Sequence, residues 1–232
     1  LMIALGLCMI LVTGTTVLKD IASQNLNSTE ILQAIIDSLT ANGRLNIFLG
    51  MFFVFMALGE GAIPLATWLF SIRRYHIRWE NLGFRKFDIQ KGLLLALAVT
   101  AIGIGISIGY EALLEYLEWG TSSDTVYTSI TPNSLGIALF AILACVVAPL
   151  AEETFFRGFL LQGIGKRLKF GWAAIISAAI FAIGHMSPSG LIPIFLLGLM
   201  LAWLFNKTRS IWPCIIVHAA YNSIALITMI KS

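Results

Sequence analysis

Residues 134–164 read SLGIALFAILACVVAPLAEETFFRGFLLQGI, an apolar run long enough to cross a bilayer as a helix. Two adjacent glutamates and an arginine, Glu152, Glu153 and Arg157, interrupt this run. A charged side chain in a spanning helix is energetically costly, so its presence indicates function. Pro149 lies just before the glutamates and predicts a kink or a break in the helix. The run therefore predicts a membrane helix that carries chemically active groups.

Further apolar segments accompany this run along the chain. They lie at roughly 1–18, 46–72, 92–114, 171–187, 190–206 and 211–230. Hydrophobic residues make up 58% of the 232 residues and charged residues only 12%, whereas a soluble domain carries about 25% charged residues. We therefore predict an all-α fold: a polytopic transmembrane helix bundle of about seven spans. It forms a single domain over 1–232, with the polar motifs in a core at about 134–230.

The connecting segments indicate how the bundle lies in the bilayer. Residues 26–41 place their apolar side chains on one helical stripe, which predicts an amphipathic interfacial helix, although a cap on the bundle fits equally well. Basic residues are concentrated in 73–91, 157–169 and 206–210, whereas 115–133 contains acidic residues but no Lys or Arg. By the positive-inside rule, the basic segments and the N-terminus face the cytoplasm.

Helical geometry gives the two adjacent glutamates different surroundings. Glu153 and Arg157 are four residues apart, so they can pair on one helix face. Glu152 is rotated by about 100° from Glu153 and need not share that arginine. The Glu152 carboxylate is then free to act as a general base where little water is present.

Two further motifs place polar groups in neighbouring spans. Phe181-Ala-Ile-Gly-His185 lies near the end of the fifth predicted span, and His218-Ala-Ala-Tyr-Asn222 lies in the seventh. His218 and Asn222 share one helix face, and both side chains can donate hydrogen bonds to an oxyanion. A water held by Glu152 and His185 could attack a peptide carbonyl held by His218 and Asn222. The residues thus predict a hydrolytic site within the membrane.

One geometric condition follows from this hypothesis. Straight, upright helices would leave Glu152 near the middle of the membrane and His185 toward the outer end of a short span. A break at Pro149, helix tilt or a re-entrant fifth segment must bring the two residues to the same depth.

Each polar residue also has a purely structural interpretation. A membrane histidine or a Glu–Arg pair often joins helices through hydrogen bonds. Glu60, within Gly59-Glu60-Gly61 of the second span, is interpreted as making a structural hydrogen bond. The chain contains no HExxH, no GxSxG and no Walker A motif, which excludes three common kinds of active site.

The three motifs, in this order and spacing, resemble those of the CAAX protease and bacteriocin-processing (Abi) family of intramembrane peptidases. The resemblance covers about 145–222, and the stretches Phe195–Trp203 and Trp79–Phe84 also look like family segments. It implies that Glu152 activates water with His185 as its partner. It also implies that Glu153 and Arg157 support the site, and that His218 and Asn222 stabilise the oxyanion.

The resemblance implies an endopeptidase that acts on membrane-associated peptides or CAAX-type protein tails in a bacterial plasma membrane. Its partners would be a peptide or protein substrate and the lipid bilayer, with no nucleic acid. Family members have been described both as metal-free glutamate peptidases, the mechanism we prefer, and as metal-dependent enzymes. In the second case Glu152, His185 and His218 would ligate a divalent metal such as zinc.

Two non-peptidase hypotheses stay open beside this one. The first is a bacteriocin-immunity or scaffold protein that keeps the same fold and acts by binding alone. The second is a small transporter that uses Glu60, Glu152 and the histidines as an ion relay. The sequence shows no inverted repeat and no paired broken helices, which argues against a transporter.

Overall fold

The structure is a computed structural model that describes residues 45–119, 134–185, 187 and 189–231. Every regular element in these ranges is a helix, so the predicted all-α fold is confirmed. The predicted first span at 1–18 and the interfacial helix at 26–41 lie outside the described residues. The main helices are α3 (Leu45–Thr67), α4 (Ile89–Tyr116), α6 (Ser134–Ile142), α7 (Ala148–Glu153), α8 (Gln162–Gly165), α9 (Phe170–Gly184), α10 (Leu191–Thr208) and α11 (Trp212–Lys231).

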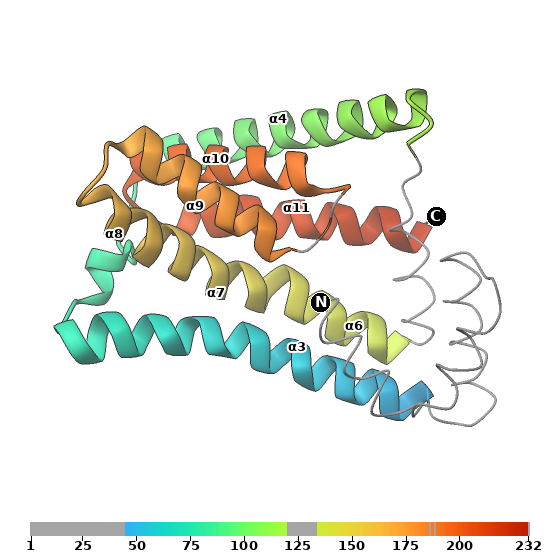
Figure 1. Cartoon of the computed structure of the whole chain (residues 1–232), viewed down its shortest axis with the longest axis horizontal. Coiled ribbons are helices and arrows are strands. Elements are labelled where there is room, and N and C mark those ends of the chain that lie inside the picture. Colours follow the sequence, from blue (N-terminus) through green and yellow to red (C-terminus); the bar gives the residue numbers. More distant parts are fainter. Residues whose placement is uncertain (1–44, 120–133, 186, 188, 232) are drawn as a thin grey trace.

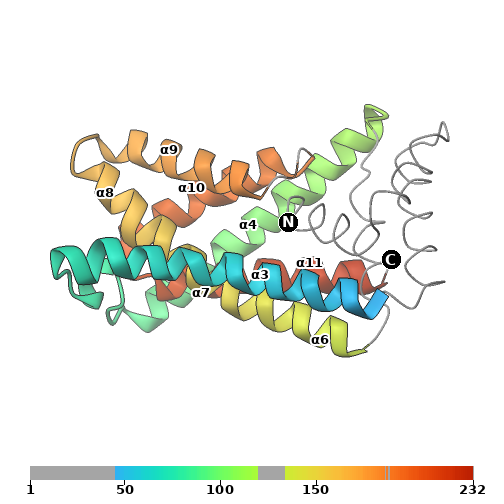
Figure 2. The ribbon, with the colours of Figure 1, turned by 60° about the horizontal axis from the view of Figure 1, so that its bottom comes forward.

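The helices run roughly along one common axis, and α3 lies beside the α6–α8 path (Figures 1 and 2). Local signals in the sequence explain several of their ends. The Asp88 side chain accepts a hydrogen bond from the Lys91 amide and caps the start of α4. At the end of α10, Arg209 has a left-handed backbone with φ 54°, which turns the chain toward α11.

α6, α7 and α8 form one continuous helical path that contains two wider, π-helical segments. These segments are Leu143–Val147, before α7, and Thr154–Leu161, after it. The sequence predicted a kink or a break at Pro149. Pro149 lies in the first turn of α7 and the helical path continues through it, so the break is not present, whereas the kink stays a prediction. Wider turns accommodate the irregularity instead, and such turns are frequent at functional sites. They bracket the short helix that carries Glu152 and Glu153.

The core lies where α9, α10 and α11 meet. Leu201, Ile211 and Val217 are fully buried there, together with Cys214. Gly198 permits the close approach of α10 to α9, because an added Cβ would lie only 3.0 Å from the Ala178 Cβ. This packing brings the end of α9 next to the middle of α11.

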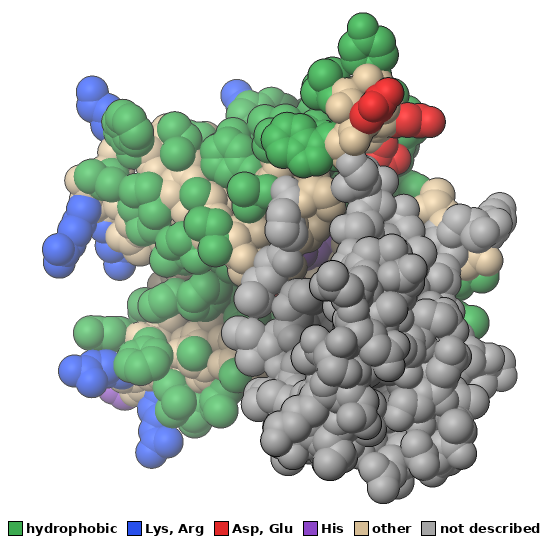
Figure 3. All heavy atoms as spheres, turned by 45° about the vertical axis from the view of Figure 1, so that its right-hand side comes forward, with side chains coloured by type: hydrophobic (Ala, Val, Ile, Leu, Met, Phe, Trp, Pro, Cys, Tyr) green, Lys and Arg blue, Asp and Glu red, His purple; other side chains and the backbone are tan. Residues whose placement is uncertain are grey.

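The described helices have the composition of an integral membrane bundle. Three of them are long and apolar enough to span a bilayer: Ile89–Tyr116, Ile137–Gly165 and Leu191–Thr208. Phe170–Gly184 and Trp212–Thr228 are shorter apolar helices. Apolar side chains cover much of the surface, with basic residues at one end and acidic residues at the other (Figure 3). The helical membrane bundle is confirmed, whereas the count of seven spans and the cytoplasmic N-terminus stay predictions.

Candidate active site

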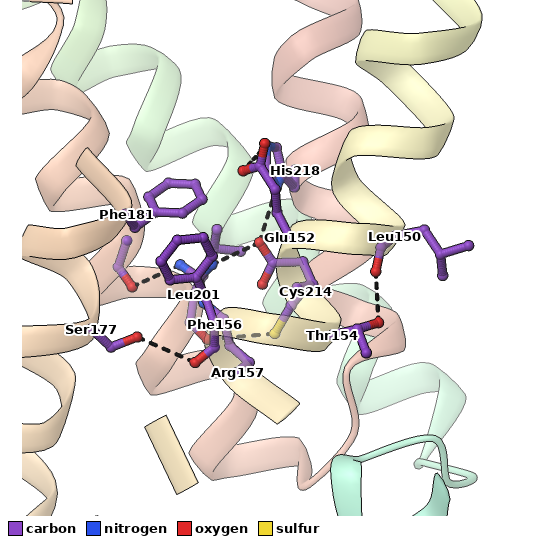
Figure 4. A network of polar contacts seen from close by, with 12 residues as sticks. Leu150, Glu152, Thr154, Phe156, Arg157, Ser177, Phe181, Leu201, Cys214 and His218 are labelled. Atoms are coloured by element: carbon purple, nitrogen blue, oxygen red, sulfur yellow. Dashed lines mark hydrogen bonds and ion pairs between the residues drawn. The ribbon is translucent and has the colours of Figure 1, made fainter. Parts of the chain in front are cut away.

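A buried group of three charged or polar side chains forms the base of the site. Arg157 Nη1 donates to Glu153 Oε1 at 2.8 Å, and His218 Nδ1 lies 2.9 Å from the same oxygen. Arg157 Nη2 donates to the Gly198 carbonyl at 3.2 Å. The Glu153 and Arg157 side chains are 0% and 1% exposed, and His218 is equally buried. The Glu153 carboxylate thus ties α7, the following π-helical segment and α11 together. Figure 4 labels Arg157 and His218 of this network.

These contacts also determine which way the His218 ring presents its second nitrogen. A carboxylate oxygen accepts, so the close contact assigns the proton of the neutral ring to Nδ1. The lone pair of Nε2 then points toward Glu152, whose Oε2 lies 4.0 Å away. His218 therefore connects the buried Glu153–Arg157 pair to the neighbouring glutamate.

Glu152 is on a different face from Glu153, as the helical geometry predicts. Its Oε2 lies 3.9 Å from His185 Nε2 and is buried without a hydrogen-bond partner. The His185 Nδ1 atom lies 2.8 Å from the Phe181 carbonyl, and a carbonyl can only accept. In the neutral ring the lone pair of His185 Nε2 therefore also faces Glu152. Three acceptors converge with no donor between them, at separations that leave room for a bridging species.

Phe181 holds the rings of the site in place. Its ring centroid lies 4.6 Å from that of His185 and 5.6 Å from that of His218. The Arg157 guanidinium carbon lies 4.6 Å from the same centroid, in cation–π geometry. From the sequence, Phe181 was only the first residue of a motif, and its packing against the two histidine rings was not predicted. Its four-residue spacing from His185 was the available signal, because it puts both rings on one helix face.

Asn222 is placed differently from the other motif residues. Its Nδ2 donates to the Ala144 carbonyl at 2.7 Å, in the π-helical segment before α7. This bond ties α11 to the helix that carries Glu152. The amide nitrogen has a second hydrogen, and its predicted role at an oxyanion stays a prediction.

The structure satisfies the depth condition set by the sequence. α9 ends at Gly184 and α10 begins at Leu191, so a short connection holds His185 at the level of Glu152. Glu60 differs from its sequence interpretation. Its Oε2 is buried and has no hydrogen-bond partner among the described residues, so the expected structural hydrogen bond is not made by this oxygen there and stays a prediction for the other oxygen.

The converging acceptors fit a divalent metal ion. Glu152, His185 and His218 each offer one ligand atom, and these atoms lie within 4.8 Å of one another. Two histidines and one carboxylate are a ligand set of catalytic zinc sites, which keep one position open. Both rings have their Nδ1 against a carboxylate or carbonyl oxygen, as metal-bound histidines commonly do. The unpaired Glu152 oxygen is consistent with the same use.

Comparisons with known proteins support a membrane peptidase. Residues 134–224 match a family model described as type II CAAX prenyl endopeptidase Rce1-like. “Putative membrane peptidase YdiL” of Bacillus subtilis (strain 168) is 26% identical over 148 residues, which cover 63% of this chain and 60% of that protein. “UPF0177 protein YxdF” of Lactococcus lactis subsp. lactis (strain IL1403) is 29% identical over 103 residues, which cover 44% of this chain and 55% of that protein.

The match spans only about 60% of the length of these curated relatives. No solved structure matches the chain. The segment matched by the family model nevertheless contains all the motif residues, from Glu152 to Asn222. Over residues 134–224 the chain is therefore similar to Rce1-like membrane endopeptidases, which confirms its resemblance to the CAAX protease and bacteriocin-processing family.

Proposed function

We propose that the chain is a membrane-embedded endopeptidase that hydrolyses peptide bonds of membrane-associated peptides or CAAX-type protein tails. The observation that carries the proposal is the unpaired, buried oxygen of Glu152, which faces the Nε2 atoms of His185 and His218. Its location would be a bacterial plasma membrane, since both matched relatives are bacterial.

Glu152 would act as the general base in the attack of water on the substrate carbonyl. A water between Glu152 Oε2 and His185 Nε2 can donate one hydrogen to each, because both atoms are acceptors. Its oxygen lone pair is then directed outward, and Glu152 takes the proton as the carbon–oxygen bond forms. The same carboxyl group can return that proton to the leaving amine.

His218 and Asn222 would stabilise the tetrahedral oxyanion. This role needs hydrogen-bond donors, and Asn222 has a second amide hydrogen beside the one given to Ala144. For His218, donation from Nε2 requires the doubly protonated ring, because Nδ1 already donates to Glu153.

The same residues also allow a metal-dependent form of the mechanism. Glu152, His185 and His218 would hold the ion, and the bound ion would polarise the substrate carbonyl and acidify a water. His218 must then be singly protonated, with its Nε2 lone pair directed to the ion. The two forms of the mechanism thus require different protonation states of the same ring.

The test uses the full chain reconstituted in liposomes with membrane-anchored peptides and CAAX-type tails, and mass spectrometry of the new termini. Glu152→Gln and His185→Ala should each abolish cleavage, whereas the exposed acidic control Glu115→Gln should cleave like the unaltered protein. Normal cleavage by both site variants would exclude the peptidase and leave the non-proteolytic binding protein. Repeating the assay with a chelator and then with added zinc separates the two mechanisms.

A further inference from the structure

Glu60 is the charged residue of α3 that the proposed mechanism does not use. The sequence of α3, LNIFLGMFFVFMALGEGAIPLAT, contains no other charged side chain. Oxygen Oε2 of Glu60 is buried and has no hydrogen-bond partner in the part of the chain that the structure describes. Buried polar groups are normally paired, and an ionisable group in an apolar helix usually has a function. Glu60 therefore requires an explanation beyond packing.

The position of Glu60 relates it to the site. α3 packs against α7, which carries Glu152 and Glu153, and the two run side by side in Figure 1. Glu60 lies near enough to Glu152 for the two carboxyl groups to interact electrostatically. The Glu60 carboxyl group thus lies on the helix that packs against α7, within electrostatic range of Glu152.

Counting charges shows what Glu60 contributes. Among the described residues, the site holds three carboxyl groups, those of Glu60, Glu152 and Glu153, and one guanidinium, that of Arg157. With both histidines neutral and all three carboxyl groups ionised, the region carries an excess of two negative charges. Such an excess is strongly unfavourable away from water unless bound protons or cations compensate it. A divalent cation supplies the charge that balances it.

We propose that Glu60 is the charge-balancing residue of a divalent-cation site whose ligands are Glu152, His185 and His218. Glu60 is not itself a ligand. It acts through its negative charge, which strengthens the binding of a doubly charged ion in surroundings of low dielectric constant. The inference rests on the metal-dependent form of the proposed function and deepens it.

The experiment measures zinc binding to the purified full chain in detergent, by competition with a chromogenic chelator. The unaltered chain should bind one zinc ion, and Glu152→Gln should lose it. Glu60→Gln should bind zinc roughly 10- to 100-fold more weakly, a loss typical of groups that support metal ligands. Glu60→Asp keeps the charge and should stay within a few-fold of the unaltered chain. Glu115→Gln removes an exposed charge and should change nothing.

The possible results distinguish failure of the role proposed for Glu60 from failure of the proposed peptidase function. If Glu60→Gln binds zinc as tightly as the unaltered chain, the role of Glu60 is overturned and the ligand set stands. Equal weakening by Glu60→Gln and Glu60→Asp also overturns it, because charge then does not matter. If the unaltered chain binds no more zinc than Glu152→Gln does, the cation site and the inference both fail. Peptide cleavage by the same preparation then decides independently whether a metal-free peptidase remains.

Thermal unfolding of each variant without zinc tests whether weaker zinc binding results from a less stable fold. Glu60→Gln should unfold at a temperature no lower than the unaltered chain, because it removes an unpaired buried charge. A lower unfolding temperature, together with weaker binding in both Glu60 variants, would assign Glu60 a structural role and overturn the proposal.

Discussion

Arg157→Leu should strongly destabilise the protein, and the structure indicates by how much. Exposed ion pairs contribute roughly 0–1 kcal/mol, but the Arg157 and Glu153 side chains are only 1% and 0% exposed. Removing one partner leaves the Glu153 charge buried and uncompensated, which typically costs about 3–5 kcal/mol. The Gly198 carbonyl also loses its donor.

The double variant Glu153→Leu/Arg157→Leu separates charge from packing. Replacing both members of a buried pair with apolar residues is often neutral, so most of the lost stability should return. Peptidase activity should not return, because His218 Nδ1 has lost its acceptor and the ring is no longer oriented toward Glu152.

Unfolding by sodium dodecyl sulfate in mixed micelles, followed by far-ultraviolet circular dichroism, gives the free energies. A loss below about 1 kcal/mol for Arg157→Leu would show that water reaches the pair, since exposed pairs are worth no more than that. A double variant no more stable than the single one would refute the argument from uncompensated charge.

Three further predictions concern the packing around the site. Gly198→Ala should destabilise the protein by roughly 1–3 kcal/mol, because the added Cβ would lie 3.0 Å from the Ala178 Cβ. The control Gly184→Ala should be tolerated, because its added Cβ has no atom within 4 Å. Thermal unfolding measures both. Phe181→Leu should cost roughly 0.5–3 kcal/mol of stability and lower kcat more than tenfold, since both histidine rings pack on that phenyl group; normal kcat would contradict the packing role. Asn222→Ala should lower kcat about 10²–10³-fold with KM little changed. Loss of stability without loss of kcat would leave Asn222 only the role of joining α11 to the π-helical segment before α7.

The helices were predictable from the sequence because their signals are local. An apolar run of suitable length predicts each helix, and the segment expected at 171–187 is observed as α9, Phe170–Gly184. The Glu153–Arg157 pair follows from four-residue spacing in the same way. The different surroundings of Glu152 follow from its rotation around the same helix.

Contacts between distant parts of the chain were not predictable in this way. His218 is 65 residues from Glu153, and nothing in its motif indicates that both Arg157 and His218 contact one oxygen of that glutamate. The hydrogen bond expected for Glu60 is not made by Oε2 within the described residues, and the local sequence does not show which groups another helix places beside that oxygen. The break expected at Pro149 is absent, because wider turns on either side absorb the irregularity.

The wider turns around α7 have a consequence for insertions and deletions. A π-helical turn holds more residues than an α-helical turn, so its length sets the rotation of everything that follows. Deleting one residue from Leu143–Val147 would restore a regular α-helix and largely keep the orientation of Glu152, whereas deleting one residue from the regular turn of α7 before Glu152 would turn that side chain by about 100° relative to α9 and α11. The helix would still cross the membrane, yet Glu152 would no longer face His185. The number of residues in this helix is thus as restrictive as their identity, and length variation should be confined to the connections between helices.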